Sequence, residues 1–328
     1  KIYLMKNLLK ITAVLFISLT TFQSCNDDND NAIPYEPEPT TNSIVDVALG
    51  SENLSTLVAA LQKADLVTTL ASQGPFTVLA PSNEAFNTFL SDNGFNSLDD
   101  VPVEILTNIL LNHVVGGRLA STDLTTGYAT TFAISSASDQ SMSIFIDTTN
   151  GVRFNGVSSV TDANIDADNG IVHLVDAVIG LPSVVTFAVA DPTFSTLVSA
   201  LTRDDLTTDF VGVLSTATGT SPAPFTVFAP TNDAFGSLLS ELGVSGLGDI
   251  DEPTLDAVLK IHVVAGANVF DTDLTDNLTV STLGGDITAN VTGGATLTDT
   301  NGRVSDIIAT NVQANNGIIH AINKVILP

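Results

Sequence analysis

The sequence predicts an α+β protein built from two tandem modules that share one fold. The strongest indication is a repeated string, PFTVLAPSNEAF at Pro75–Phe86 and PFTVFAPTNDAF at Pro224–Phe235. Each copy follows a segment with helical apolar periodicity and precedes a stretch rich in Thr, Val, Ile, Gly and Asn. Helices followed by a run of short strands are typical of an α+β domain, and the repetition of the whole pattern indicates two such domains.

The spacing of the repeats sets the size of each module. Phe76 and Phe225 are 149 residues apart, whereas an earlier pair of matching strings, beginning at Ser55 and Ser195, is 140 apart. The second module therefore carries nine extra residues between these landmarks. The loop-like composition of Thr216–Pro224 indicates a surface insertion there.

An amphipathic helix opens each module. Apolar residues recur in it at positions i, i+3, i+4 and i+7, which is the spacing of one helical face. The stripe consists of Leu54, Leu57, Val58 and Leu61 in the first module, and of Phe194, Leu197, Val198 and Leu201 in the second.

The repeated string itself predicts a strand, a proline stop and a second helix. Phe76–Leu79 and Phe225–Phe228 are β-rich runs that end at Ala-Pro. A Ser or Thr then caps the next helix, and an acid in its first turn complements the helix dipole. Both copies keep this chemistry, so we interpret the corner as structural. Its residues are Ser82, Asn83, Glu84, Thr231, Asn232 and Asp233.

A third helix in each module ends in a histidine on its apolar stripe. The stripe is Leu106, Ile109, Leu110 and His113 in the first copy, and Leu255, Val258, Leu259 and His262 in the second. Because the histidine continues a buried stripe, we expect a core position for it.

Short strands with tight turns fill the rest of each module. Asn169-Gly170 and Asn316-Gly317 are hairpin signals before the last strand. In that strand His173 and His320 alternate with apolar residues, so each histidine shares a face with apolar neighbours.

The first 24 residues have the features of a secretory signal. Lys1, Lys6 and Lys10 precede an apolar run at Ile11–Phe22, which is too short to span a membrane. Cys25 is the only cysteine of the chain, and its position resembles a bacterial lipoprotein cleavage site, where the cysteine carries the lipid. The expected division is 1–24 signal peptide, 25–42 spacer, 43–182 first domain and 183–328 second domain.

The spacer is acidic and rich in proline, which is typical of a solvated linker. An acidic run directly after the cysteine is also similar to the signal that exports lipoproteins of Bacteroidetes-type bacteria to the cell surface. Either interpretation accounts for its composition. With lipidation, the sequence predicts an outer-membrane lipoprotein that is exposed at the cell surface.

The strong negative charge of the chain disfavours nucleic acids as partners. Without the three lysines of the signal, 7 basic residues face 36 acidic ones, a net charge of −29. Such a field repels phosphate backbones and anionic membrane surfaces, so we expect no nucleic-acid ligand and a membrane link only through lipid on Cys25. The absence of Trp also disfavours sugar binding by aromatic stacking.

These motifs, in this order and found twice, resemble the fasciclin family of extracellular adhesion modules. The resemblance rests on the strand–corner–helix string, the helix ending in His-Val-Val, and Asn-Gly-Ile-Val/Ile-His before an apolar strand that ends in Pro. It covers about 43–182 and 183–328. It implies, for each module, a wedge-shaped β-sandwich of about seven strands with a set of packed helices.

Catalytic and metal sites are disfavoured. Two histidines of one module and a carboxylate would form a metal site, but their apolar faces favour buried histidines that bond to the backbone. No Gly-x-Ser-x-Gly elbow supports a hydrolase. Asp162, Asp166 and Asp168 lack the spacing and closing Glu of a calcium loop. We expect a non-enzymatic protein without cofactor or metal.

The fasciclin resemblance also implies a candidate partner site. Many animal members carry a Tyr-His pair that is proposed to engage integrins. The matching pairs here are Asn112-His113 and Ile261-His262, so the tyrosine is missing from both.

The leading hypothesis is a lipid-anchored surface protein that mediates adhesion through an extracellular protein, matrix or polysaccharide ligand. Its binding surface would use loops such as Thr216–Pro224 or Ser136–Asn150, where the modules differ. The alternative is an accessory ligand-binding lipoprotein for outer-membrane uptake of glycans or small molecules.

Overall fold

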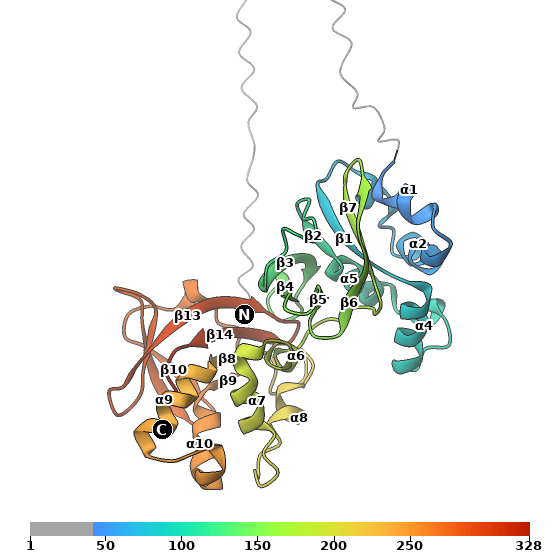
Figure 1. Ribbon diagram of the computed structural model, residues 1–328. Helices are drawn as coiled ribbons and strands as arrows, with labels where there is room; N and C mark the ends of the chain where they lie inside the picture. Colours follow the sequence, from blue (N-terminus) through green and yellow to red (C-terminus); the bar gives the residue numbers. More distant parts are fainter. Residues whose placement is uncertain (1–41) are drawn as a thin grey trace, which may run out of the picture. The chain divides into compact units, whose positions relative to one another are not determined.

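The computed structural model describes residues 42–328, which form two modules with the same order of elements (Figure 1). The helices of the first module are α1 (Ile44–Leu49), α2 (Ser55–Lys63), α3 (Val67–Ala71), α4 (Asn83–Asp92) and α5 (Val103–Asn112). Its strands are β1 (Phe76–Pro81), β2 (Val114–Gly116), β3 (Gly127–Ile134), β4 (Ser141–Asp147), β5 (Arg153–Phe154), β6 (Ser158–Ala167) and β7 (Gly170–Val175).

The second module repeats this order. Its helices are α6 (Val184–Ala190), α7 (Ser195–Leu201), α8 (Phe210–Leu214), α9 (Asn232–Leu242) and α10 (Glu252–Ile261). Its strands are β8 (Phe225–Pro230), β9 (Val263–Ala265), β10 (Leu278–Thr282), β11 (Gly285–Asn290), β12 (Thr296–Thr298), β13 (Val304–Gln313) and β14 (Gly317–Ile322). The expected α+β architecture, with seven strands in each module, is confirmed.

The strands of each module form one continuous hydrogen-bonded series. In the first module β1 to β7 close into a ring, and in the second the same series is open between β9 and β10. The first and last strands of each module, β1 with β7 and β8 with β14, pair in parallel, and the other pairs are antiparallel. This parallel pair brings the repeated string beside the strand that carries the second histidine.

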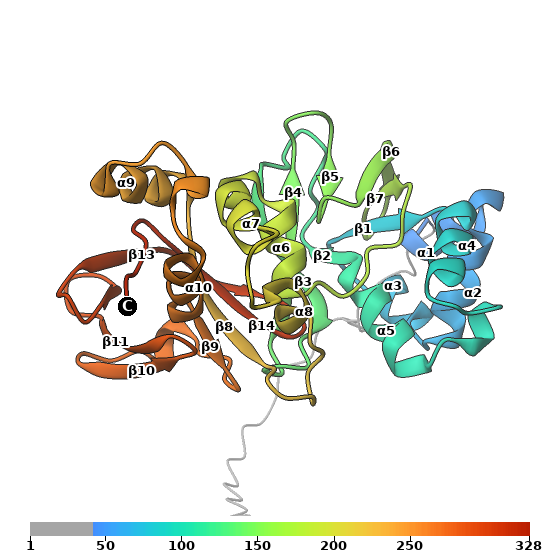
Figure 2. The same cartoon turned by 90° about the horizontal axis from the view of Figure 1, so that it is seen from below.

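Helices cover one side of this parallel pair. In the first module α1, α2 and α4 lie together beside β1 and β7 (Figures 1 and 2). The apolar stripes predicted for α2 and α5 point into this layer, where Leu57, Leu61, Leu106 and Leu110 are buried. Burial of a Leu side chain stabilises by roughly 1.5–3 kcal/mol, so the helical layer is held mainly by these stripes.

The two modules contact each other through β3 and β4. Tyr128 donates a hydrogen bond to Asp191 (3.0 Å), and the backbone amide of Gln313 donates one to the hydroxyl of Ser143 (3.0 Å). The expectation of a binding loop at Ser136–Asn150 is therefore wrong, because buried strand β4 runs through it. Polar residues flank the short apolar run of β4, so the sequence pattern does not predict a buried strand there.

The nine extra residues of the second module form two insertions. The side-chain amides of two equivalent asparagines donate to the carbonyls of Leu70 and Ser72 in the first module and of Leu214 and Thr216 in the second. These partners are 144 residues apart. Four extra residues therefore lie before α8, and only five belong to the loop Thr216–Pro224.

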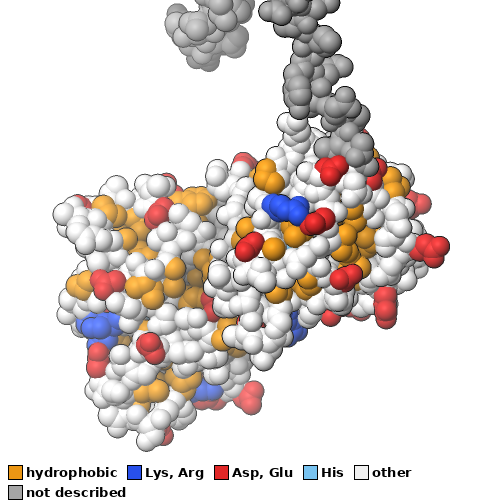
Figure 3. All heavy atoms as spheres, turned by 45° about the horizontal axis from the view of Figure 1, so that its top comes forward, with side chains coloured by type: hydrophobic (Ala, Val, Ile, Leu, Met, Phe, Trp, Pro, Cys, Tyr) orange, Lys and Arg blue, Asp and Glu red, His pale blue; other side chains and the backbone are white. Residues whose placement is uncertain are grey.

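Acidic side chains are spread over the visible face of the described residues, and Lys and Arg are few (Figure 3). No single helix within residues 42–328 is long and apolar enough to cross a membrane. Segments Val184–Ala190 and Pro192–Leu201 reach the length and apolar composition of a membrane span only when taken together, and they are bent by 94° relative to each other. Both contribute to the core of the second module.

Candidate functional site

The residues of the repeated corner bond within their own module. Ser82 Oγ and Thr231 Oγ1 accept from the amides three residues later, at 3.1 and 3.3 Å, and so cap α4 and α9. Asn83 accepts from the amide of Thr56 and donates to the carbonyl of Glu52, both at 2.9 Å. Asn232 repeats this pair of bonds in the second module. Glu84 and Asp233 lie in the first turn of each helix.

His113 and His262 connect the end of a helix to the segment after the last strand. Nδ1 of His113 lies 2.7 Å from the carbonyl of Ile109, and its Nε2 accepts from the amide of Ile179 at 2.9 Å. His262 makes the same pair of bonds, at 2.6 and 3.0 Å. This geometry fixes the neutral tautomer with the proton on Nδ1. Burial lowers the pKa of both histidines to about 4.

His173 and His320 hold a bulge in the preceding strand. Their Nε2 atoms donate to the carbonyls of Leu119 and Val269, both at 2.9 Å. Their Nδ1 atoms accept from the amides of two asparagines in the left-handed region, Asn164 (φ 64°) and Asn311 (φ 59°). The pairing register shifts at both positions. The backbone amide of the extra residue in each bulge therefore donates its hydrogen bond to the histidine ring.

This arrangement leaves little for metal chemistry. Both ring nitrogens of every histidine are within hydrogen-bonding distance of the backbone, so no lone pair is free to coordinate an ion. Across residues 42–328, no group of three or more His, Cys, Asp or Glu side chains has metal-binding geometry. Of the three acids that superficially suggested a calcium loop, Asp166 pairs with Arg118 and Asp168 accepts from the amide of Asn42.

The pairs that match the Tyr-His positions of animal fasciclins lie in the core. Their relative exposures are 0% for Asn112, 2% for His113, 1% for Ile261 and 3% for His262. Asn112 donates to the carbonyl of Gly180 at 3.0 Å. These side chains therefore present no surface to a partner. Cys25 and the acidic spacer lie outside the described residues.

Asn169 and Asn316 have a role that the sequence did not indicate. The side-chain oxygen of Asn169 accepts from the amide of Ile44 at 2.9 Å, and its nitrogen donates to the carbonyls of Leu70 (2.7 Å) and Ser72 (2.8 Å). Asn316 repeats all three bonds. The identical Asn-Gly strings are a sequence signal, but by themselves they predict only turns.

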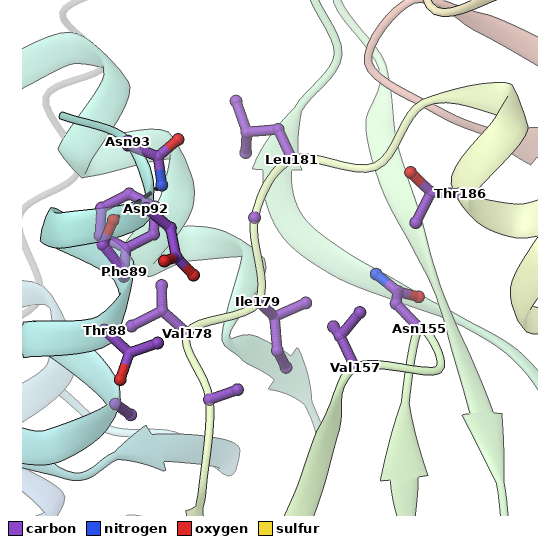
Figure 4. Close-up of a pocket in the computed structure, with 13 residues that line it drawn as sticks. Thr88, Phe89, Asp92, Asn93, Asn155, Val157, Val178, Ile179, Leu181 and Thr186 are labelled. Carbon is purple, nitrogen blue, oxygen red and sulfur yellow. Dashed lines mark hydrogen bonds between the residues drawn. The ribbon is translucent and has the colours of Figure 1, made fainter. Parts of the chain in front are cut away.

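A cavity of about 380 Å³ lies between α4 and the β5–β6 hairpin of the first module, and Thr186 of α6 also lines it. Asp92 and Asn93 extend from α4 on one side, and Asn155 and Val157 lie on the opposite side (Figure 4). Phe89 and the segment after β7 complete much of the wall. The volume is within the range of small-ligand sites, so this cavity is the strongest candidate for a binding site in the first module.

One polar group at this cavity has no partner. Asn155 is 3% exposed and its side-chain oxygen accepts from the amide of Phe145 at 2.7 Å. Its side-chain nitrogen is buried and has no hydrogen-bond acceptor among residues 42–328. A buried donor without an acceptor is costly, and this one belongs to the wall of the cavity.

A second cavity, lined by apolar residues except for Thr202, lies in the second module. It measures about 120 Å³ and is bounded by α6, α7, α8 and strands β8 and β14. The equivalent space in the first module is only about 10 Å³. At one lining position Ile44 of the first module is replaced by the smaller Val184 in the second.

Comparisons with known proteins agree with the fold. The sequence model of the fasciclin domain family matches residues 52–182 and 192–328 of this chain. Protein sll1483 of Synechocystis sp. is 36% identical over 137 residues, which cover 42% of this chain and 72% of that protein. Human periostin is 28% identical over 271 residues, which cover 79% of this chain but only 29% of periostin.

A solved structure supports the same assignment. It is the FAS1 domain pair from the insect cell adhesion molecule Fasciclin I, which aligns with 84% of this chain and 97% of its own, at a TM-score of 0.51 and 19% identity. Both halves of the described chain thus have the fold and the family motifs in the same order. The chain belongs to the fasciclin domain family, with two tandem copies of the domain.

Proposed function

We propose that this chain is a non-enzymatic, lipid-anchored cell-surface protein whose two fasciclin domains mediate adhesion or binding of an extracellular ligand. The observation that carries the proposal is the double family match over 52–182 and 192–328. Fasciclin domains are extracellular adhesion modules, and the repeated motif residues bond within their own modules here. Lipid on Cys25 would supply the membrane anchor.

An adhesion assay on the purified protein tests the functional part of this proposal. Immobilised protein should capture cells or extracellular matrix above the level of an unrelated protein of equal negative charge. A glycan array on the same protein distinguishes the uptake alternative. Selective oligosaccharide binding without attachment of cells or matrix would contradict the adhesion role.

The anchor needs its own experiment. We expect Cys25→Ala to release the expressed protein from the membrane fraction, whereas Cys25 in the unchanged chain retains it. If the Cys25→Ala variant remains in the membrane, lipidation at this residue is wrong, and the adhesion result is unaffected.

A further inference from the structure

In the second module an arginine side chain occupies the space that corresponds to the cavity of the first module. Arg303, in the β12–β13 hairpin, contacts Glu241 near the end of α9 at 2.6 Å. Asp92 is the equivalent residue on α4, since both follow the repeated phenylalanine, Phe86 or Phe235, by six positions. Asp92 lines the cavity and has no ion pair within residues 42–328.

The lengths of the two hairpins explain this difference. Three residues separate the paired Phe154 and Ser158 in the first module, whereas seven separate the paired Leu297 and Ser305 in the second. The longer hairpin carries Arg303 across to α9. The shorter one carries no arginine after β5, and the space between hairpin and helix is the cavity of about 380 Å³.

The walls of the cavity suit an arginine side chain. The carboxylate of Asp92 can accept two parallel bonds from a guanidinium. Phe89 lines the same cavity, and an aromatic face attracts a guanidinium and its apolar stem. The equivalent of Phe89 in the second module is the aliphatic Leu238. The aromatic ring is thus present in the module whose hairpin supplies no arginine to this space, and absent from the module that has Arg303.

The unpartnered nitrogen of Asn155 adds a second requirement. It needs an acceptor oxygen, which a guanidinium lacks but the main chain or carboxylate of an arginine supplies. The charge of the protein, 36 acidic against 10 basic residues in the whole chain, also draws cationic ligands toward it and repels anionic ones.

We propose that the cavity between α4 and the β5–β6 hairpin binds arginine, with its guanidinium at Asp92 in the place that Arg303 takes beside Glu241. The carbonyl or carboxylate oxygen of the ligand accepts from Asn155. The source of the arginine is a polypeptide or the free amino acid. This site does not depend on lipid anchoring or on adhesion by other surfaces.

Titration of the purified protein with a capped Gly-Arg-Gly peptide, followed by calorimetry or chemical-shift changes, tests the proposal. We expect saturable binding at one site, and binding at least about tenfold weaker for the same peptide with citrulline, which is neutral and close in shape. Free L-arginine is titrated in parallel. Tighter binding of the peptide assigns the source to a polypeptide, and equal or tighter binding of the amino acid assigns it to free arginine; both support the site.

Two matched variants locate the site. Asp92→Asn keeps the shape of an exposed residue and should weaken peptide binding about tenfold. Glu241→Gln removes the equivalent charge in the second module and should change it less than twofold. Equal binding of arginine and citrulline peptides, unchanged binding by Asp92→Asn, or no saturation up to about 10 mM would overturn the proposal.

Discussion

The two modules have the same internal hydrogen bonds but differ in how they fill the space beside α4 and α9. Equivalent histidines, capping residues and asparagines make the same contacts in both copies. At the hairpin, however, the second module places Arg303 against Glu241, and the first leaves a cavity at Asp92. Features common to both copies therefore build the domain, and differences between them indicate where one copy binds something else.

The largest expected effect is on a shared feature. Asn169→Ala removes three hydrogen bonds and leaves a buried amide and two carbonyls unpaired. We expect the free energy of unfolding to fall by about 3–5 kcal/mol, measured by urea denaturation and circular dichroism. Asn87→Ala, an exposed site on α4, is the control and should cost less than about 0.5 kcal/mol. A similar loss for both variants would contradict the role of Asn169.

A pH dependence should follow from the shared histidines. An unfolded histidine takes up a proton below about pH 6.5, whereas the pKa of folded His113 is about 4. The stabilising contribution of the neutral, buried ring is thus complete above pH 6.5 and is lost as the pH falls toward 4. It amounts to about 2–3 kcal/mol between pH 7 and 4.5.

Comparison with a variant isolates this contribution from the general effect of charge. The difference in unfolding free energy between the unchanged protein and His113→Gln should become smaller by about 2–3 kcal/mol when the pH is lowered from 7 to 4.5. His262→Gln should behave alike, because its pKa is also lowered to about 4. A gap that does not change with pH would show that His113 is not buried in its neutral form.

A smaller effect is expected where the modules differ. Arg303→Ala removes the contact with Glu241 and the approach to buried Asp299 at 3.5 Å. We expect a loss of about 1–2 kcal/mol in the stability of the second module. Arg153→Ala, at an exposed hairpin arginine of the first module, should change stability by less than about 0.5 kcal/mol. Urea denaturation of both variants makes the comparison, and equal losses would show that Arg303 is only a surface residue.

The smallest effect concerns the apolar cavity. Val184→Ile restores the methylene that Ile44 supplies in the first module, where the equivalent space is about 10 Å³ instead of about 120 Å³. We expect a gain of about 0.5–1 kcal/mol, visible as a higher denaturation midpoint. The reverse change, Ile44→Val, should cost a similar amount. A destabilising Val184→Ile would mean that the space is not available to the side chain.

Much of the fold could be predicted because its signals are local and occur twice. The stripes of α2 and α5 follow from periodicity, and the caps at Ser82 and Thr231 follow from residue type at a helix start. The parallel pairing of β1 with β7 and of β8 with β14 has no such local signal. The sequence predicts only a turn at Asn169, because the partners of this side chain lie about 100 residues away. It predicts the same for Gly170, yet a Cβ there would lie 2.1 Å from the carbonyl oxygen of Phe76.

The candidate site was missed for a different reason. The cavity exists because a hairpin is short and an arginine is absent, and an absence has no sequence pattern of its own. Asp92 and Phe89 look like ordinary surface and core positions of an amphipathic helix. Only the alignment of Asp92 with Glu241, together with the contact from Arg303, distinguishes them.

The stoichiometry of arginine binding tests the comparison most directly. The unchanged protein should bind one equivalent of the capped Gly-Arg-Gly peptide, at the cavity of the first module. Arg303→Ala opens the equivalent place in the second module beside Glu241, so this variant should bind two equivalents, and Asp92→Asn in the same chain should return it to one strong site. A stoichiometry that Arg303→Ala leaves unchanged would contradict the equivalence of the two places.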